Sequence, residues 1–585
     1  MIRYAIGSLM LFSAGFLIFH GKEAAHSGSW DYVVTHDDEY IYWAIAQGST
    51  ASPASDANPF YYEERTRNNP VPSYLAVTAA GRLAAALDIQ VLALLPPWKI
   101  LMPFLSWLVF FLCLVRLWGY NPAISAAVSM LVLLSTLFLH GAAQFTLFRF
   151  PRPGDSLWLA ILWLSLLVHA DRMSPRRYQA VMLAIAFATM AITPYYTILQ
   201  VWTGALQCAW DWRVRRDWPQ ARSHLTVLLV LFFCACGYLL FILLHMDESH
   251  WVGLVLDVGQ AGSRQPHFFS LLLYALICSM VFAAWRACGS LSRLDRLVLF
   301  VLALEPLTAN VQLVFGQDHQ IGFHRYYFLV LEITCLVGWA VEKLQFLVRH
   351  AAFRRADIYL AAALGLIAAY VLLSPQLNYF RDLPRDVPTF HSFDNSLQLL
   401  GLLPLLLLCP WIVLRFASIS RFLRRPLVAV LAIAAIAFCG FYFRSSQLRD
   451  FNREIPFTGA YAWLAEHGSK DAVLLTGPPQ RSVIDYALFY AGVKSYANPS
   501  GQRLSLDAVD MEYRRYVYSS LLHGGLGVVL PEYSSIRQKM KHLKLDYILL
   551  EWPSPHEKHV TSQLLGYIRE VYRDERCILW ELVVP

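Results

Sequence analysis

The sequence predicts a polytopic α-helical membrane protein of about 13 transmembrane helices, followed by an extracytoplasmic α/β domain. Of its 585 residues, 57% are hydrophobic and only 15% are charged, whereas a soluble domain carries about 25% charged residues. The apolar residues gather in blocks of roughly 17–22, the length that crosses a hydrocarbon core about 30 Å thick. These blocks end near residue 443, and shorter helix-like and strand-like segments follow. The chain therefore divides into a membrane module, residues 1–444, and an outer domain, residues 445–585.

The first apolar block, residues 4–20, has the character of a signal peptide as well as of a membrane span. No cleavage site of the A-x-A type follows it cleanly, so we expect it to be retained. With this block included, the predicted spans cover residues 4–20, 100–118, 121–141, 156–170, 179–194, 196–211, 224–245, 268–286, 295–315, 326–343, 358–374, 396–414 and 427–443.

Arginine residues predict the orientation of these spans, because they cluster in short loops on one side of the membrane and that side is normally cytoplasmic. The clusters are Arg116; Arg172, Arg176 and Arg177; Arg213, Arg215, Arg216 and Arg222; Arg286, Arg293 and Arg296; Lys343, Arg349, Arg354 and Arg355; Arg415, Arg421, Arg424 and Arg425. We therefore expect a multi-pass protein of the cytoplasmic (inner) membrane. Its loop 21–99 and its C-terminal domain then face the periplasm or exterior. The net charge of +7 reports this orientation and does not indicate nucleic acid as a partner.

Two outer segments have local structure of their own. Residues 71–94 in the first loop show the pattern of an amphipathic helix that lies in the membrane plane. In the tail, residues 460–466 indicate a helix, residues 472–476 and 546–551 indicate strands, and residues 567–572 with 577–583 indicate a hairpin.

An acidic triplet, Asp37-Asp38-Glu39, follows the first span and precedes Tyr40. Three adjacent carboxylates repel one another, so water, a metal ion or a cationic ligand must stabilise them. Close to a bilayer surface such a cluster favours a working site, with a solvated loop as the alternative.

Two later outer loops add basic groups and one further carboxylate. Arg149 and Arg152 could hold a phosphate or lipid headgroups, and Asp155 could act in the site or cap the fourth span. A later loop, residues 317–325, supplies two histidines and an arginine, His319, His324 and Arg325. His319 could equally be a solvated loop residue.

Carboxylates beside guanidinium and imidazole groups suit a reaction in which an acceptor is deprotonated and an anionic phosphate is held. The sequence has no Walker loop, no G-x-S-x-G, no H-E-x-x-H and no cysteine-rich metal pattern. ATP-driven, serine-hydrolase and zinc-peptidase functions therefore lose their usual support.

The motif Asp37-Asp38-Glu39-x-x-Tyr42 after an apolar first span resembles the GT-C superfamily of membrane glycosyltransferases. Asp155, the late His319 to Arg325 loop and the outer α/β domain extend the resemblance along the chain. It implies an inverting transfer of a sugar from a polyprenyl-phosphate donor to a glycan, lipid or protein acceptor. The W-W-D motif of oligosaccharyltransferases is absent, which favours transfer of a single sugar over transfer of a whole glycan to asparagine.

The same resemblance implies roles for individual residues. Asp38 is the first choice for the general base, with Asp37 second and Glu39 beside them. Mg²⁺ or Mn²⁺ could be held by oxygen ligands from Asp38 and Asp155, with Asp37 as a further ligand. The residues implied in substrate binding are Arg325, His324, His319, Arg149, Arg152 and Tyr40.

A transporter or flippase of lipid-linked sugars is the main alternative function, and a non-catalytic scaffold is another. Transporters keep ionisable groups near the bilayer midplane, often within inverted repeats. In this sequence the spans are poor in such groups, apart from Glu305 beside Pro306, and no repeat is visible. A scaffold would explain the outer domain but not the triplet.

Overall fold

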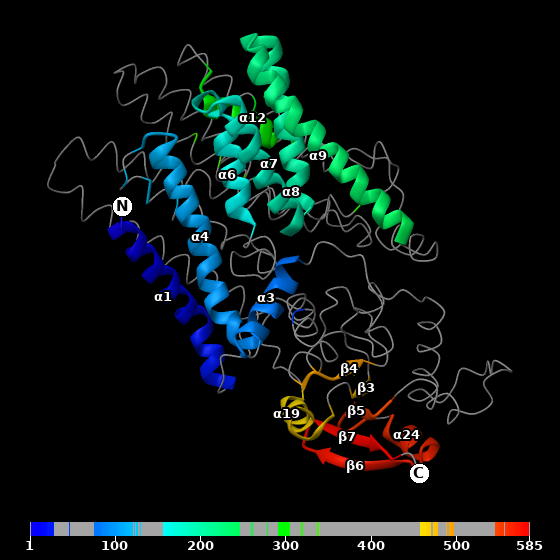
Figure 1. The fold of residues 1–585 in the computed structure, drawn as a ribbon. Helices are drawn as coiled ribbons and strands as arrows, with labels where there is room; N and C mark the ends of the chain where they lie inside the picture. The colour runs from blue at the N-terminus through cyan, green and yellow to red at the C-terminus, as the bar shows by residue number, and fades with distance from the viewer. Residues whose placement is uncertain are drawn as a thin grey trace, which may run out of the picture. The chain divides into compact units, whose positions relative to one another are not determined.

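The computed structural model of the chain forms two compact units (Figure 1). The first comprises Met1–Thr35, Pro97–Tyr238 and Leu256–Arg449, and the second comprises His36–Pro96, Leu239–Val255 and Asp450–Pro585. The structure describes residues 2–27, 46, 75–89, 91–120, 122, 125–126, 129, 156–192, 194–245, 259–260, 278, 291–304, 318–319, 331, 335, 339, 457–469, 472–477, 487, 491–495, 545–554 and 556–583.

Apolar helices dominate the described part of the first unit. They are α1 (Ile2–Ser27), α4 (Leu95–Arg116), α6 (Leu157–Leu167), α7 (Pro175–Ile192), α8 (Pro194–Trp210), α9 (Trp218–His245) and α12 (Arg293–Leu302). Helices α6, α7 and α8 pack on one another, and α12 packs on α8. Their common core includes the buried side chains of Trp107, Trp163 and Tyr178.

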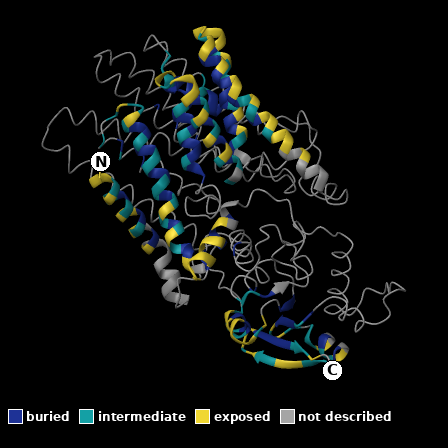
Figure 2. Cartoon of the chain, in the orientation of Figure 1, coloured by how far each residue is buried: buried dark blue, intermediate teal, exposed yellow. Residues whose placement is uncertain are grey.

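Two of the described helices, Leu95–Arg116 and Trp218–Gly237, are long and apolar enough to cross a membrane. Figure 2 shows exposed positions along much of α9, where Phe232 and Phe233 are 60% and 67% exposed. Such an apolar strip is unfavourable in water and suits a lipid environment. The two helices agree with the predicted spans 100–118 and 224–245. The total of about 13 spans stays a prediction.

Several helix boundaries differ from the predicted ones. Helix α1 continues to Ser27, beyond the predicted end at residue 20. Helix α9 begins at Trp218 rather than at residue 224, because Asp217 acts as an N-terminal cap. Its Oδ1 accepts the backbone N–H of Gln220 at 3.3 Å. Helix α12 begins with a capping box between Ser292 and Asp295, close to the predicted start.

The predicted interfacial helix of residues 71–94 is present in a shorter form. It consists of α3 (Leu75–Ala86), a turn, and the 3₁₀ segment η3 (Val91–Leu94). Val77, Ala80 and Ala84 are buried, with the spacing of one helical face, whereas Leu83 is 45% exposed. An apolar side chain on the exposed side is consistent with a helix that lies at the membrane interface.

The C-terminal part of the second unit contains a five-stranded sheet in the order β4-β3-β5-β7-β6. Strand β3 pairs parallel with β4 and β5, whereas β7 pairs antiparallel with β5 and β6. The strands are β3 (Val473–Gly477), β4 (Lys494–Ser495), β5 (Tyr547–Glu551), β6 (Ile568–Arg573) and β7 (Cys577–Leu582).

A helix covers each face of this sheet. Val560 and Leu564, at α24 (Glu557–Gln563), join the core that includes Ile548 and Leu550 of β5. On the opposite face, Trp463 of α19 (Thr458–His467) contacts the ring of Tyr547, with centroids 6.1 Å apart. The predicted helix, two strands and hairpin of the tail are thus confirmed, and β4 is an addition.

Candidate functional site

Most of the site predicted from the sequence lies outside the described residues. This holds for Asp37, Asp38, Glu39, Tyr40, Arg149, Arg152, Asp155, His324 and Arg325. The N-cap position of α6 is Ser156, whose side chain makes no capping hydrogen bond. Because Asp155 lies outside the described residues, its role as a cap and its role in the site both stay predictions.

His319 is the predicted site residue whose backbone the structure describes. It lies in β2 (Asp318–His319), which pairs antiparallel with β1 (Gly259–Gln260). Gly259 is opposite His319, and Gln260 is opposite Asp318. By the predicted topology both strands belong to outer loops, 246–267 and 316–325. The pairing therefore brings a third outer loop next to the predicted His and Arg loop.

Lys99 is a buried cation that sequence reasoning did not single out. It lies in the first turns of α4, after Pro96 and Pro97, and is only 1% exposed. A buried ammonium group requires polar or anionic partners, and Lys99 is not without an interaction in the structure. The predicted topology places this end of α4 at the outer face. A lone lysine at the outer end of a predicted span was the signal that could have identified it.

Within the described part of the chain, no group of three or more His, Cys, Asp or Glu side chains is placed to hold a metal ion. The carboxylates proposed as metal ligands, Asp38 and Asp155, lie outside that part, so the expected Mg²⁺ or Mn²⁺ site stays a prediction.

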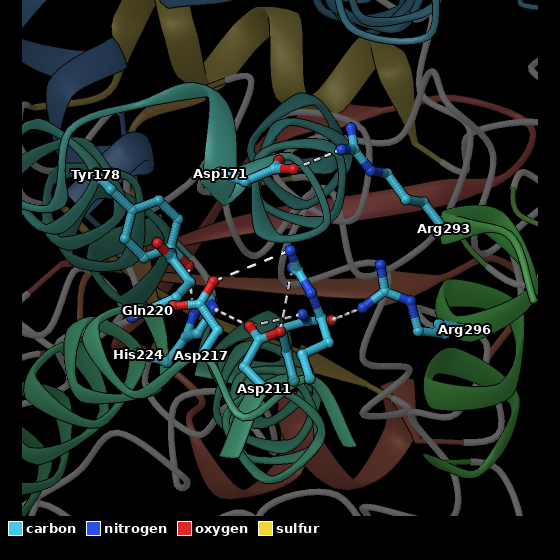
Figure 3. A network of polar contacts seen from close by, with 10 residues as sticks. Asp171, Tyr178, Asp211, Asp217, Gln220, His224, Arg293 and Arg296 are labelled. Carbon is cyan, nitrogen blue, oxygen red and sulfur yellow. Dashed lines mark hydrogen bonds and ion pairs between the residues drawn. The ribbon is translucent and has the colours of Figure 1, made fainter. Parts of the chain in front are cut away.

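The structure does describe a polar network at the arginine-rich ends of the helices (Figure 3). Its centre is Asp211, which is 0% exposed and begins the π-helical turn η7 (Asp211–Arg215) after α8. Asp211 Oδ2 accepts from Gln207 Nε2 at 2.9 Å and from His224 Nε2 at 3.2 Å. Oδ1 accepts from Arg215 at 3.3 Å. The other ring nitrogen of His224, Nδ1, lies 2.7 Å from the hydroxyl oxygen of Tyr178 and forms a hydrogen bond with it.

Two further contacts extend this network to α12. Arg296 is 6% exposed and donates to Gln207 Oε1 at 3.4 Å, with its guanidinium over the ring of Trp210. Arg293 of α12 forms an ion pair at 2.6 Å with Asp171, which lies in the short connection between α6 and α7. The network therefore ties together α7, α8, α9 and α12.

Hydroxyl, imidazole and carboxylate follow one another in this network, which is the order of groups in a proton relay. However, Tyr178 and His224 are each only 1% exposed and Asp211 is 0% exposed. A substrate therefore does not reach the Tyr178 oxygen in this arrangement. The network also lies on the arginine-rich side, which the predicted topology places opposite to the acidic triplet. We assign it to holding the helix ends together rather than to chemistry.

No family model matches the chain, and no curated protein matches it. Among solved structures, one similar chain is that of ArnT from Cupriavidus metallidurans, in a crystal structure with bound undecaprenyl phosphate. The alignment covers 99% of this chain and 99% of the ArnT chain, at 16% sequence identity and with a TM-score of 0.48.

Proposed function

We propose that this protein is a membrane glycosyltransferase that moves a sugar from a polyprenyl-phosphate donor to an acceptor on the outer face of the cytoplasmic membrane. The acidic triplet carries the proposal. Asp37, Asp38 and Glu39 follow α1 in a loop that the arginine distribution places outside. Later outer loops supply the basic groups that an anionic donor requires.

In this reaction Asp38 removes the proton from an acceptor hydroxyl while the hydroxyl oxygen attacks the anomeric carbon of the donor sugar. The bond between that carbon and the phosphate oxygen breaks, and polyprenyl phosphate leaves with the electron pair. Attack from the face opposite the leaving group inverts the anomeric configuration. Asp37 or Glu39 would replace Asp38 as the base if repulsion within the triplet keeps Asp38 protonated.

The departing phosphate gains negative charge as the bond breaks, so cations that face it lower the barrier. Arg325 is the first candidate, because a guanidinium group binds phosphate through paired N–H donors. His319 and His324 belong to the same loop as Arg325. Arg149 and Arg152 are further candidates for binding the phosphate.

Two structural observations support a phosphate site at the outer face. The pairing of β1 with β2 joins the His319 backbone to the predicted outer loop 246–267. The buried Lys99 is a further cation, at the end of α4 that the predicted topology places outside. Oxygen ligands from Asp38 and Asp155 suit Mg²⁺ or Mn²⁺, which would neutralise phosphate charge when bound.

The experiment that tests the proposal is mass spectrometry of lipid-linked sugars and envelope glycans from cells with and without the gene. We expect cells without the gene to lack one sugar on an envelope component and to accumulate the sugar on its polyprenyl-phosphate carrier. The wild-type gene on a plasmid should restore both signals. Identical profiles in all strains would contradict the proposal.

A further inference from the structure

A second charged surface, outside the proposed site, lies on the connection between α8 and α9. We call residues 211–222 the α8–α9 turn. Trp212 and Trp218 are 49% and 60% exposed, and their rings meet edge to face with centroids 5.8 Å apart. Exposed arginine side chains lie on the same turn. They are Arg213, Arg215, Arg216 and Arg222.

The backbone of this turn is fixed in shape. The carbonyl oxygen of Asp211 accepts the backbone N–H groups of Arg216 and Asp217, the latter at 2.9 Å. Arg216 has a φ of 54° in the left-handed region, which non-glycine residues adopt only when surrounding contacts impose it. The buried Asp211 carboxylate is also held by Gln207 and by His224, and Figure 3 shows Asp211 beside His224. The exposed side chains of the turn are therefore attached to a preorganised base.

Charge is unevenly compensated on the turn. Arg215 forms ion pairs with both acidic residues of the turn, Asp211 at 3.3 Å and Asp217 at 4.0 Å. Among the residues that the structure describes, no ion pair joins Arg213 or Arg222 to a carboxylate. The turn therefore presents guanidinium groups that are available to an external anion.

The exposed apolar side chains indicate which class of anion the turn binds. Val214, on the same turn as the two indoles, is 59% exposed, and Phe232 and Phe233 of the following helix α9 are also exposed. Free phosphate would use the arginines alone, whereas tryptophan side chains favour the headgroup level of a bilayer. Guanidinium groups bind phosphate diesters through paired N–H donors.

We propose that the α8–α9 turn binds the phosphate of an anionic phospholipid, with Trp212 and Trp218 at the headgroup level and Arg213 and Arg222 on the phosphate. The site is independent of the proposed glycosyl transfer. By the arginine distribution it selects phosphatidylglycerol-type lipids in the cytoplasmic leaflet.

The test uses the full-length protein in neutral detergent, titrated with short-chain phosphatidylglycerol and followed by native mass spectrometry. The variant is Arg213→Gln with Arg222→Gln. The matched control is Lys558→Gln with Arg569→Gln, which removes two exposed charges from the C-terminal domain. We expect the variant to bind about thirtyfold more weakly and the control to bind as the wild type does.

A second measurement is independent of any folding defect in the variant. Phosphatidylglycerol with brominated acyl chains should quench fluorescence of the wild-type protein, and Trp212→Phe with Trp218→Phe should lose a defined part of that quenching. Equal binding of phosphatidylcholine, full displacement by inorganic phosphate, or equal affinities of variant and control would each overturn the proposal.

Discussion

The arginine-rich ends of the helix bundle and the C-terminal α/β domain use charged side chains in opposite ways. At the helix ends, the central charged groups of the polar network are buried, with Asp211 0% and Arg296 6% exposed. In the described part of the C-terminal domain the ion pairs lie at the surface, and the Arg569 side chain that pairs with Glu581 is 68% exposed. The core of that domain is apolar.

The predicted membrane topology accounts for the difference through the solvent around each region. Burial of apolar surface drives folding in water, but lipid tails are as apolar as leucine and offer no such gain between helices. Polar contacts must then fix how the helices meet. Trp163 donates to Thr203 between α6 and α8, and Gln200 donates to Thr189 between α8 and α7. The Asp211 network continues the same principle at the helix ends.

The largest expected contrast is that the C-terminal domain and the α8–α9 turn lie on opposite sides of the membrane. We expect a cysteine introduced by Lys558→Cys to react in intact cells with a membrane-impermeant thiol reagent, and one introduced by Arg213→Cys to react only after the membrane is permeabilised. Both positions are exposed, so folding does not limit access. Labelling of both positions in intact cells would refute the predicted orientation.

Removal of the buried carboxylate should produce the next largest effect. Asp211→Asn leaves Gln207, His224 and Arg215 competing for one oxygen, so we expect a loss of about 3–5 kcal/mol in the free energy of unfolding. The matched control, Glu581→Gln, breaks the exposed pair with Arg569 and should change stability by at most about 1 kcal/mol. Unfolding in mixed micelles measures both, and equal losses would remove the distinction between the regions.

A smaller effect is expected where α19 meets the sheet. A Cβ atom on Gly459 would lie 1.9 Å from the hydroxyl oxygen of Tyr572. Gly459→Ala should therefore destabilise the C-terminal domain by about 1–3 kcal/mol through overpacking. Tyr572→Phe in the same chain removes the clashing oxygen and should restore part of the loss. Hydrogen exchange of α19 measures this, and a fully stable Gly459→Ala protein would show that the contact is not tight.

The smallest effect is a pH dependence at the turn between β6 and β7. Burial raises the pKa of Asp574, but hydrogen bonds from the Arg576 and Cys577 amides and from the Tyr572 hydroxyl outweigh it, so the pKa falls below its ordinary 3.8. The ionised carboxylate therefore stabilises the turn above pH 3.8, and this contribution is lost as the pH falls through the lower, folded-state pKa.

Asp574→Asn should accordingly speed exchange of the Arg576 and Cys577 amides at neutral pH. The difference from the wild type should vanish in acid, after correction for intrinsic exchange rates. A difference that persists unchanged in strong acid would assign the effect to shape rather than to charge.

The sequence predicts local structure where one apolar pattern decides it. Residues 473–475 of β3 and 548–550 of β5 are all valine, isoleucine or leucine, and residues 107–115 of α4 are an unbroken apolar run. Strand β4 was missed because Lys494 and Ser495 show no such pattern, and pairing with β3 alone defines it.

Contacts between distant residues could not be predicted in the same way. His224 meets Asp211 only because a π-helical turn and the cap at Asp217 reverse the chain between them. Likewise, no local pattern shows that Gly259 lies opposite His319. The acidic triplet was identified because its members adjoin in sequence, and their arrangement in space stays a prediction.

The most direct test of the proposed function is sugar transfer by the purified protein in detergent micelles, where no second compartment exists for transport. With a polyprenyl-phosphate sugar donor and envelope acceptor, we predict that Asp38→Asn lowers the transfer rate by about 10²–10⁴-fold while donor binding is nearly unchanged. Arg213→Gln, which the predicted topology places on the opposite side of the membrane, should transfer at the wild-type rate. If Asp37→Asn loses transfer and Asp38→Asn does not, the general base is Asp37. Full transfer by Asp37→Asn, Asp38→Asn and Glu39→Gln alike would contradict the account.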